Sequence, residues 1–400
     1  MPSYSGVWNL VSQYQAKANL QWPQAPGAPT SVSATAGDAS ATVSFIAPTF
    51  TGVPPGITGY LATSSPGGIT ATGASSPLTV TGLTNGTAYT FGVQATNGVQ
   101  YGPAGTSGSV TPAAPTALFG GGDVSGVNTN VIQFINISST GNATDFGDLS
   151  AANAYLSACS SSTRGVFLGG NTGSITNTIQ YVTISSAGNS LDFGDLLNGR
   201  SEGGACSNST RGLVGAGSPN GACGNTVEYI TIASTGNSTS FGNLVINMYN
   251  IASLASSTRG CFAGGQSPPS YALVNSIYYV TIATTGNATT FGDLAVPTNG
   301  FAGCSSSTRG LFGGGGQAGN VIQYITIAST GNATDFGDLT TSRSQLSATS
   351  SSTRGVFGGG GLTNIIDYVT IASTGNATDF GDLLASLTNL YACSNAHGGL

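Results

Sequence analysis

Apolar and polar positions alternate in short runs along most of the chain, and the runs return at a regular interval. The stretch 350–360, SSSTRGVFGGG, combines a polar turn, a short apolar strand and a glycine stop. A repeat with a period in the 40s and a glycine doublet indicates a propeller or a solenoid. Near copies of it centre on five arginines at spacings of 47, 48, 50 and 45 residues: Arg164, Arg211, Arg259, Arg309 and Arg354.

Each repeat predicts four short strands. In the last repeat they are strand a at 345–349, strand b at 354–357, strand c at 366–371 and strand d at 377–383. Strand c is apolar on both faces, as expected of a strand packed between neighbouring sheets. Strand d carries a second repeated phrase, and its phenylalanine returns six times: Phe146, Phe193, Phe241, Phe291, Phe336 and Phe380.

The two ends of the repeat region complement each other. Residues 118–122 form a strand b without its strand a, and residues 390–394 form a strand a without its strand b. Counting gives six of each strand, so we predict a six-bladed β-propeller whose C-terminal strand closes the blade begun near residue 117. Closure removes exposed sheet edges, whereas a solenoid would leave two open ends.

The repeats resemble kelch propeller repeats through the glycine doublet after strand b and an aromatic residue in strand c. The resemblance implies a kelch-like propeller over residues 114–400. It departs where strand d carries Phe instead of the family's Trp, and where Gly215-Ala216-Gly217 interrupts a doublet. The strand-c aromatics are Phe134, Tyr181, Tyr229, Tyr279, Tyr324 and Tyr368.

Residues 24–113 predict a separate sandwich of short alternating strands. Leu83 lies six residues before Tyr89 across an Asn-Gly turn, the arrangement of a tyrosine corner, in which the Tyr hydroxyl bonds back to the preceding loop. With Ala28-Pro29, this region resembles a fibronectin type III domain, although Phe45 stands where the family has Trp. Such domains are mostly spacers. We expect strands at 32–35, 41–45, 58–62 and 87–95.

Residues 1–23 carry both tryptophans of the chain, Trp8 and Trp22, together with Tyr4 and Val11. A segment this short cannot bury them against itself, so it is either a strap on the next domain or an anchor in a larger assembly. Residues 6–10, with the motifs that follow them, resemble the opening of tail and fibre proteins of tailed bacteriophages. That resemblance implies docking to other virion proteins.

Composition narrows the possible functions. Only 6% of residues are charged and the net charge is −6, which argues against nucleic-acid or anionic-membrane binding. No apolar run reaches the roughly 20 residues of a membrane helix, and no signal peptide is visible. Four of the six cysteines, Cys159, Cys206, Cys304 and Cys393, occupy equivalent places in different repeats, so we expect buried free thiols acting as small apolar residues.

The turns divide into two sets, which an antiparallel four-stranded blade places on opposite faces. The a–b and c–d turns are nearly uniform between repeats, whereas the b–c and d–a loops differ in length and content, as in 266–275 and 317–320. Loops on a rigid scaffold are the usual place for recognition. The chain enters the repeats at strand b, so we expect the preceding domain on the uniform face and the variable face pointing away.

The repeated arginines form the clearest constellation, with His397 expected near the sixth position. The structural interpretation is that each Arg pairs with an acid of the Phe-Gly-Asp-Leu phrase or caps nearby carbonyls. The alternative is an axial anion site, since guanidinium groups suit carboxylates and phosphates. The acids in question are Asp148, Asp195, Asp293, Asp338 and Asp382.

Other chemistry is weakly supported. The repeated Asp145-Phe146-Gly147 lacks the rest of a kinase active site, and the glycine runs lack the ending of a phosphate loop. A calcium site at Asp145 and Asp148 would need more carboxylates. With one histidine, a Ser-His-Asp system is nearly excluded, and most acids recur as structural groups do. We expect no cofactor, no metal and no enzyme activity.

These features together predict a non-enzymatic virion protein of a tailed phage that recognises a host-surface glycan or protein, and it is a possible homo-oligomer on the particle. The candidate ligand residues on the variable loops are Asn247, Met248, Tyr249 and Tyr271, because aromatic rings supply stacking area for sugars. A purely architectural fibre, capsid or baseplate component, a polysaccharide depolymerase and a cellular adhesin remain alternatives.

Overall fold

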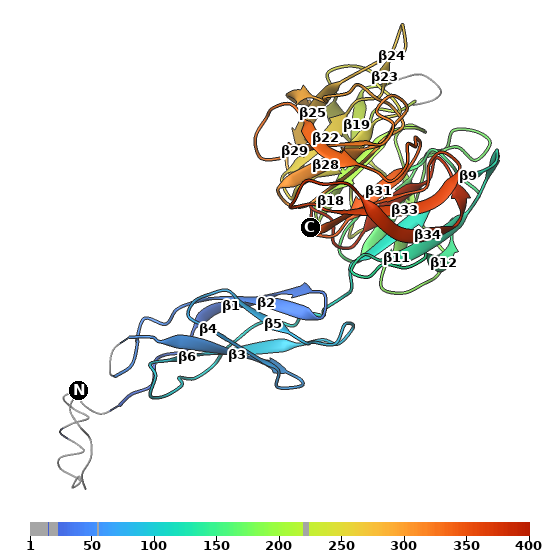
Figure 1. The fold of residues 1–400 in the computed structure, drawn as a ribbon. Helices are drawn as coiled ribbons and strands as arrows, with labels where there is room; N and C mark the ends of the chain where they lie inside the picture. The colour runs from blue at the N-terminus through green and yellow to red at the C-terminus, as the bar shows by residue number, and fades with distance from the viewer. Residues whose placement is uncertain (1–14, 16–22, 54–55, 219–223) are drawn as a thin grey trace. The chain divides into compact units, whose positions relative to one another are not determined.

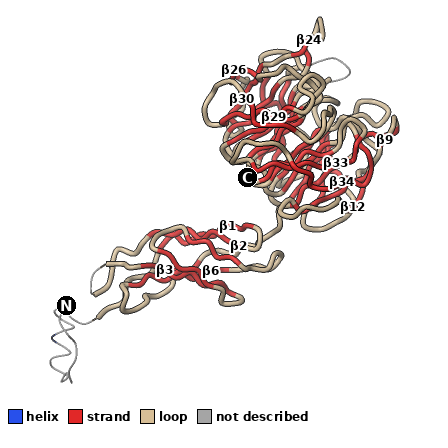
Figure 2. The backbone as a smooth tube through the Cα atoms, viewed as in Figure 1, coloured by secondary structure: helices blue, strands red, loops and turns tan. Residues whose placement is uncertain are grey.

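The computed structural model describes residues 15, 23–53, 56–218 and 224–400, and every element named in them is a β-strand (Figures 1 and 2). The chain is all-β and divides into two compact units, Met1–Ala114 and Pro115–Leu400. Among the described residues, no helix has the length and apolar character needed to cross a membrane.

Unit 1 contains two antiparallel sheets around one core. The first has β1 (Thr30–Gly37), β2 (Ser40–Ile46) and β5 (Leu78–Thr81). The second has β4 (Thr70–Gly73), β3 (Gly59–Ser65), β6 (Thr90–Thr96) and β7 (Gly105–Thr106). Side chains of period two point inward from both sheets, as in β2, where Ala41, Val43 and Phe45 are buried. Phe45, at the position where Trp was expected, packs on Tyr60 with ring centroids 4.6 Å apart.

The predicted tyrosine corner is confirmed. The backbone N–H of Thr84 donates to the hydroxyl of Tyr89 at 3.1 Å, and both Leu83 and Tyr89 are buried. The bond ties the loop to β6, the strand that Tyr89 precedes.

Unit 2 contains six four-stranded antiparallel sheets, numbered here 1 to 6. Sheet 1 has β12 (Thr144–Asp148), β11 (Val131–Asn136), β8 (Thr116–Gly120) and β35 (Tyr391–Ser394). Sheet 2 has β13 (Ser157–Ser160), β14 (Arg164–Leu168), β15 (Thr178–Thr183) and β16 (Leu191–Asp195). Sheet 3 has β17 (Gly204–Ser207), β18 (Arg211–Gly215), β19 (Thr226–Thr231) and β20 (Thr239–Asn243).

Sheet 4 has β21 (Ala252–Ala255), β22 (Arg259–Ala263), β25 (Ser276–Thr281) and β26 (Thr289–Asp293). Sheet 5 has β27 (Ala302–Ser305), β28 (Arg309–Gly313), β29 (Val321–Thr326) and β30 (Thr334–Asp338). Sheet 6 has β31 (Ser347–Ser350), β32 (Arg354–Gly358), β33 (Thr363–Thr370) and β34 (Thr378–Leu387). Two short hairpins, β9 (Asp123–Val124) with β10 (Val127–Asn128) and β23 (Gln266–Ser267) with β24 (Ala272–Leu273), project from the loops.

The C-terminal strand pairs with the sheet that begins near residue 117, as the strand count predicted. β35 lies antiparallel to β8, with Tyr391 opposite Gly120 and Ser394 opposite Ala117. In Figure 1 the red C-terminal strands accordingly lie beside the cyan-green β11 and β12. The first strands of sheets 2 to 6 (β13, β17, β21, β27 and β31) contact one another in order, and β35 contacts both β31 and β13.

The core of unit 2 lies between neighbouring sheets. Leu118 and Phe146 of sheet 1 pack with Phe167 of sheet 2 in one cluster, and Phe380 of sheet 6 packs with Phe119 of sheet 1 in another. The glycine after each apolar run permits this approach: a Cβ on Gly120 would lie 2.5 Å from the ring of Phe167. The apolar strands are therefore buried on both sides, which matches the continuous apolar runs of the sequence.

The second repeated phrase joins each sheet to the next. The N–H of Gly188 donates to the carbonyl of Phe146 at 2.7 Å, and the N–H of Asp148 donates to Oδ1 of Asn189 at 3.0 Å. The same pair of bonds links sheet 6 to sheet 1, where the N–H of Gly141 donates to the carbonyl of Phe380. The Thr-Gly-Asn turns and the Phe-Gly-Asp strands are thus two halves of one contact.

The expected free thiols are confirmed for the described cysteines, Cys159, Cys206, Cys261, Cys304 and Cys393, all of which are buried. Burial raises the pKa of Cys261 and of Cys393 to about 12, so both stay protonated near neutral pH. Cys223 lies outside the described residues.

Candidate functional site

The five repeated arginines connect neighbouring sheets. Each guanidinium carbon lies 4.3–4.8 Å from the ring centre of the strand-c tyrosine in its own sheet. Each Nη1 also donates to an isoleucine carbonyl of the following sheet at 2.8–3.1 Å. The Arg–Tyr–Ile sets are Arg164–Tyr181–Ile232, Arg211–Tyr229–Ile282, Arg259–Tyr279–Ile327, Arg309–Tyr324–Ile371 and Arg354–Tyr368–Ile137.

Of the two kinds of partner expected for these arginines, the structure has the backbone carbonyls and not the acids. The carbonyl contacts agree with the capping interpretation, but the two ion pairs among the described residues do not include these arginines or the Phe-Gly-Asp-Leu acids. The acids instead belong to the turn contact described above, through their backbone N–H groups. Two cavities lie between the strands β13, β17, β21, β27, β31 and β35, and none of the five arginines lines either of them. The placement of the arginines therefore gives no support to an axial anion site.

His397 does not occupy the sixth arginine position. That position is Thr116, whose N–H donates to Oδ1 of Asn395 at 2.7 Å, just as the N–H of Arg164 donates to Ser161 Oγ at 3.1 Å. The chain follows the repeat up to Asn395 and then turns away, because no strand b follows.

The C-terminal residues contact β13, β17 and β27, and the contact to β17 is between His397 Nε2 and Ser207 Oγ at 3.3 Å. Nδ1 of His397 accepts from the N–H of Gly399 at 3.1 Å, so Nε2 carries the proton that it donates to the Ser160 carbonyl at 3.1 Å. The N–H of Gly398 donates to the carbonyl of Ser305 at 2.9 Å. Burial lowers the pKa of His397 to about 4, and the bond to Ser160 opposes that shift.

A cavity next to His397 is lined by β13, β17, β21, β27, β31 and β35, and the space between these six strands is here called the axial space. Serines there connect the sheets: Ser207 Oγ donates to the Ser160 carbonyl and Ser160 Oγ to the Ser394 carbonyl, both at 2.7 Å. His397 is part of the lining. The tail therefore closes this end of the axial space.

The variable loops place the rings of Tyr249 and Tyr271 in contact. Their ring centroids are 6.1 Å apart at 82°. Tyr249 also exchanges two backbone hydrogen bonds with Gln266, at 3.0 and 3.1 Å, which holds the hairpin of β23 and β24 against this loop. Tyr271 is 57% exposed and Asn247 is exposed.

Met248, also expected in the ligand site, is buried at 0% exposure among the core residues of sheets 3 and 4. Its carbonyl accepts from Gly217 at 2.9 Å, as the carbonyl of Arg200 accepts from Gly170 at 2.8 Å. Met248 thus stands at a position that points into the sheet, and it packs the core instead of contacting a ligand.

Two buried ion pairs escaped the sequence analysis. Arg200 pairs with Glu228, and Arg343 Nη2 lies 2.7 Å from Asp367 Oδ2. Burial lowers the pKa of both arginines while the acids oppose that shift. Arg343 also donates to the carbonyls of Gly359, Ile365 and Phe357, so the pair fills the centre of its sheet.

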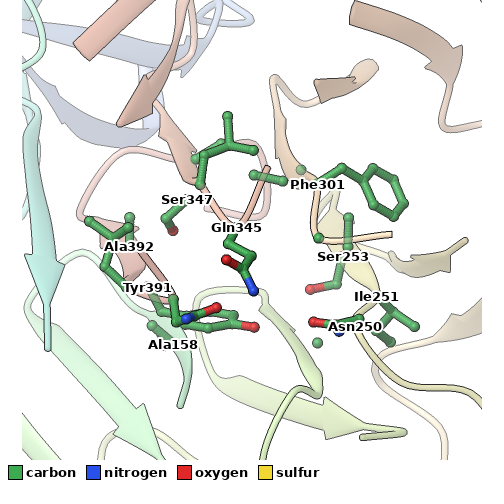
Figure 3. A pocket seen from close by; sticks show the side chains of 18 of the residues that line it. Ala158, Asn250, Ile251, Ser253, Phe301, Gln345, Ser347, Tyr391 and Ala392 are labelled. Atoms are coloured by element: carbon green, nitrogen blue, oxygen red, sulfur yellow. The ribbon is translucent and has the colours of Figure 1, made fainter. Parts of the chain in front are cut away.

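A second cavity, of about 60 Å³, lies at the end of the axial space on the side of the variable loops (Figure 3). Its polar lining includes Asn250, Ser253, Gln345 and Tyr391. In Figure 3 the Gln345 amide projects into the space that the Tyr391 hydroxyl and the Asn250 amide face. The lining contains no acid, histidine or cysteine. This arrangement offers hydrogen bonds to a ligand and holds no acid–base pair.

The remaining candidates are placed as follows. Among the described residues no cluster of three or more His, Cys, Asp or Glu side chains is arranged to hold a metal. Tyr4, Trp8, Val11 and Trp22, the expected docking residues, lie outside the described residues.

Comparison with protein families finds a match at residues 27–111, to the fibronectin type III domain. Comparison with curated proteins finds no match for the chain. The match coincides with the two-sheet sandwich and its tyrosine corner. Residues 27–111 are therefore a fibronectin type III domain.

Proposed function

We propose that the chain is a non-enzymatic structural protein of a tailed-phage virion that recognises a host-surface glycan or protein. In this proposal unit 2 is a six-bladed, kelch-like β-propeller, and the loops on one of its faces bind the receptor. The N-terminal segment with Tyr4, Trp8, Val11 and Trp22 docks to other virion proteins, and the fibronectin type III domain is a spacer.

The propeller proposal rests on the return of every sheet-to-sheet contact from sheet 6 to sheet 1. Strand β35 completes sheet 1, Arg354 reaches the carbonyl of Ile137, and Gly141 bonds to Phe380. An open stack would leave these groups of the first and last sheets unpaired.

The recognition proposal rests on the difference between the two loop sets. The polar groups of the uniform turns are already hydrogen-bonded between sheets, as in Arg164 to Ile232 and Asp148 to Asn189. The variable loops present exposed groups such as Tyr271, next to Tyr249 and Asn247. A surface built for contact within the molecule has few groups left for a partner, so the partner is expected on the variable side.

The test is binding of the purified full chain to an array of bacterial surface glycans and to intact cells that bind it. We expect Tyr271→Ala combined with Asn247→Ala to weaken binding at least tenfold without changing the melting temperature. The matched control is Tyr101→Ala, an equally exposed tyrosine of the fibronectin type III domain. Full binding by the double variant would favour a purely architectural role, and new reducing ends in a bound polysaccharide would favour a depolymerase.

A further inference from the structure

Six residues form a backbone ring at the mouth of the axial space, and each lies two positions before one of the strands β13, β17, β21, β27, β31 and β35. All have φ between 53° and 61°, the left-handed region. Each N–H donates to the carbonyl of its counterpart in another sheet at 2.6–3.2 Å, and the series returns to its start. In order, the donors are Glu202, Asn250, Gly300, Gln345, Asn389 and Tyr155, bonded to Tyr155, Glu202, Asn250, Gly300, Gln345 and Asn389.

Five of these six positions keep a side chain in a conformation that suits glycine. A non-glycine residue there adopts a backbone conformation that its Cβ disfavours, and Gly300 demonstrates that glycine fits the ring. Strain of this kind concentrates at functional sites. The retained side chains therefore call for a role other than building the ring.

Gln345 and Asn250 face the 60 Å³ cavity of Figure 3 with free hydrogen-bonding capacity. Among the described residues, neither side-chain amide has a hydrogen-bond partner, whereas the backbone groups of both residues are paired in the ring. A polar group in a partly enclosed site forfeits hydrogen bonds that a ligand can supply. Since the ring fixes the backbone beneath them, these amides are pre-organised for a ligand.

The chemistry of the cavity fits a neutral, hydroxyl-rich group. Amides and the hydroxyls of Tyr391 and Ser253 alternate with the apolar side chains of Ile251 and Phe301. None of the described residues in the lining is cationic, because the seven arginines are either in the sheet-to-sheet contacts or buried in ion pairs. Burial raises the pKa of Glu202. Burial and the nearby charge of Glu202 both raise the pKa of Tyr391. A further negative charge is therefore disfavoured at this edge of the cavity.

We propose that the axial cavity binds the terminal sugar of an uncharged glycan, with Gln345 and Asn250 hydrogen-bonding its hydroxyl or acetamido groups. The inference rests on the proposed function and places its receptor site at the axis, separate from Tyr249 and Tyr271. At about 60 Å³ the cavity admits one edge of a monosaccharide, so the rest of the glycan lies over the surrounding loops.

The experiment measures binding of free neutral monosaccharides (glucose, galactose, rhamnose and N-acetylglucosamine) to the full chain by saturation-transfer NMR and titration. The variants Gln345→Gly and Asn250→Gly remove the side chains while keeping the left-handed backbone, as Gly300 does. We expect each to weaken binding about tenfold, with unchanged or higher thermal stability. Gln317→Gly, an exposed Gln of a variable loop outside the cavity lining, is the matched control.

The outcomes separate this inference from the proposed function. Retained sugar binding in both glycine variants, or no binding of any of the four sugars to the wild type at 50 mM, overturns the axial site. Displacement of the sugar signal by a lysine-containing peptide instead of by a second neutral sugar also overturns it. Glycan-array binding that depends on Tyr271 but not on Gln345 keeps the proposed function and rejects the axial site.

Discussion

Arg343 and Asp367 test how strongly a single residue position determines the stability of a sheet. Arg343→Leu leaves the Asp367 carboxylate buried without its partner, and we expect unfolding to become easier by about 3–5 kcal/mol. The contact between sheets 6 and 1 supplies a matched rescue, because Leu387 at the end of β34 and Gln133 in β11 occupy the equivalent positions there. Adding Asp367→Gln should restore most of the loss. Urea unfolding followed by circular dichroism measures both effects, and a double variant as unstable as the single one contradicts the account.

The orientation of the side chains at these positions could not be predicted from the sequence. The repeat period aligned Asn153, Arg200, Met248, Thr298, Arg343 and Leu387, but neither spacing nor polarity reveals that they point into the sheet. The available signal was a coincidence within repeats: Arg stands there only where strand c carries an acid, Glu228 or Asp367. The prediction that Met248 lies on the surface was wrong, because its neighbours Asn247 and Tyr249 suggested an exposed loop.

At the scale of elements, the tail at 397–400 makes stability depend on pH. Burial holds the pKa of His397 at about 4, below its ordinary 6.5, so the folded chain keeps it neutral. As the pH falls from 6.5 towards 4, His397 becomes protonated in the unfolded chain but stays neutral in the folded chain. The free energy of unfolding therefore falls by about 1–3 kcal/mol. Above pH 6.5 both states are neutral and the contribution vanishes.

The measurement is urea unfolding of the wild type and of His397→Gln at pH 7.5, 6, 5 and 4. Because glutamine has no titrating group, we expect the stability difference between the two proteins to shift in favour of the variant as the pH falls. A difference that stays constant over this range would mean that the tail accepts the proton without leaving its site, which contradicts the burial of His397 between Ser160 and Gly399.

Strands were the most predictable elements. The period and the glycine stops located strand b at 354–357, and the structure has it at Arg354–Gly358. A structural role was one of two interpretations of the repeated arginines, but their partners lie far away in sequence. The tyrosines are 14–20 positions from their arginines, and the carbonyls are 62–71 positions away, or 217 for Arg354. The axial backbone ring was not foreseen, because φ above zero has no fixed signature at Tyr155, Glu202 and Gln345.

For unit 2 as a whole, we expect stability to depend most on the pairing of the C-terminal strand β35 with β8. Deleting 391–400 removes β35, so β8 becomes an open edge and Cys393 leaves the cluster that contains Leu118 and Phe167. An unpaired edge beside exposed core invites association between molecules. We expect the truncated chain to aggregate and to unfold at lower urea, as light scattering and circular dichroism would record. Deleting only 398–400 is the control, since it keeps β35 and its pairing.

Restoration in trans distinguishes loss of closure from general damage. A synthetic peptide of residues 387–400 carries β35 and the tail, and it can add to the β8 edge by backbone pairing and by filling the cluster with Cys393. We expect the peptide to bring the truncated chain back to a monomer with the wild-type unfolding midpoint, and a Cys393→Asp peptide to fail because a charge cannot enter that core. If the truncated chain were monomeric and fully stable alone, sheets 6 and 1 would not depend on β35, and the proposed propeller would lose its physical basis.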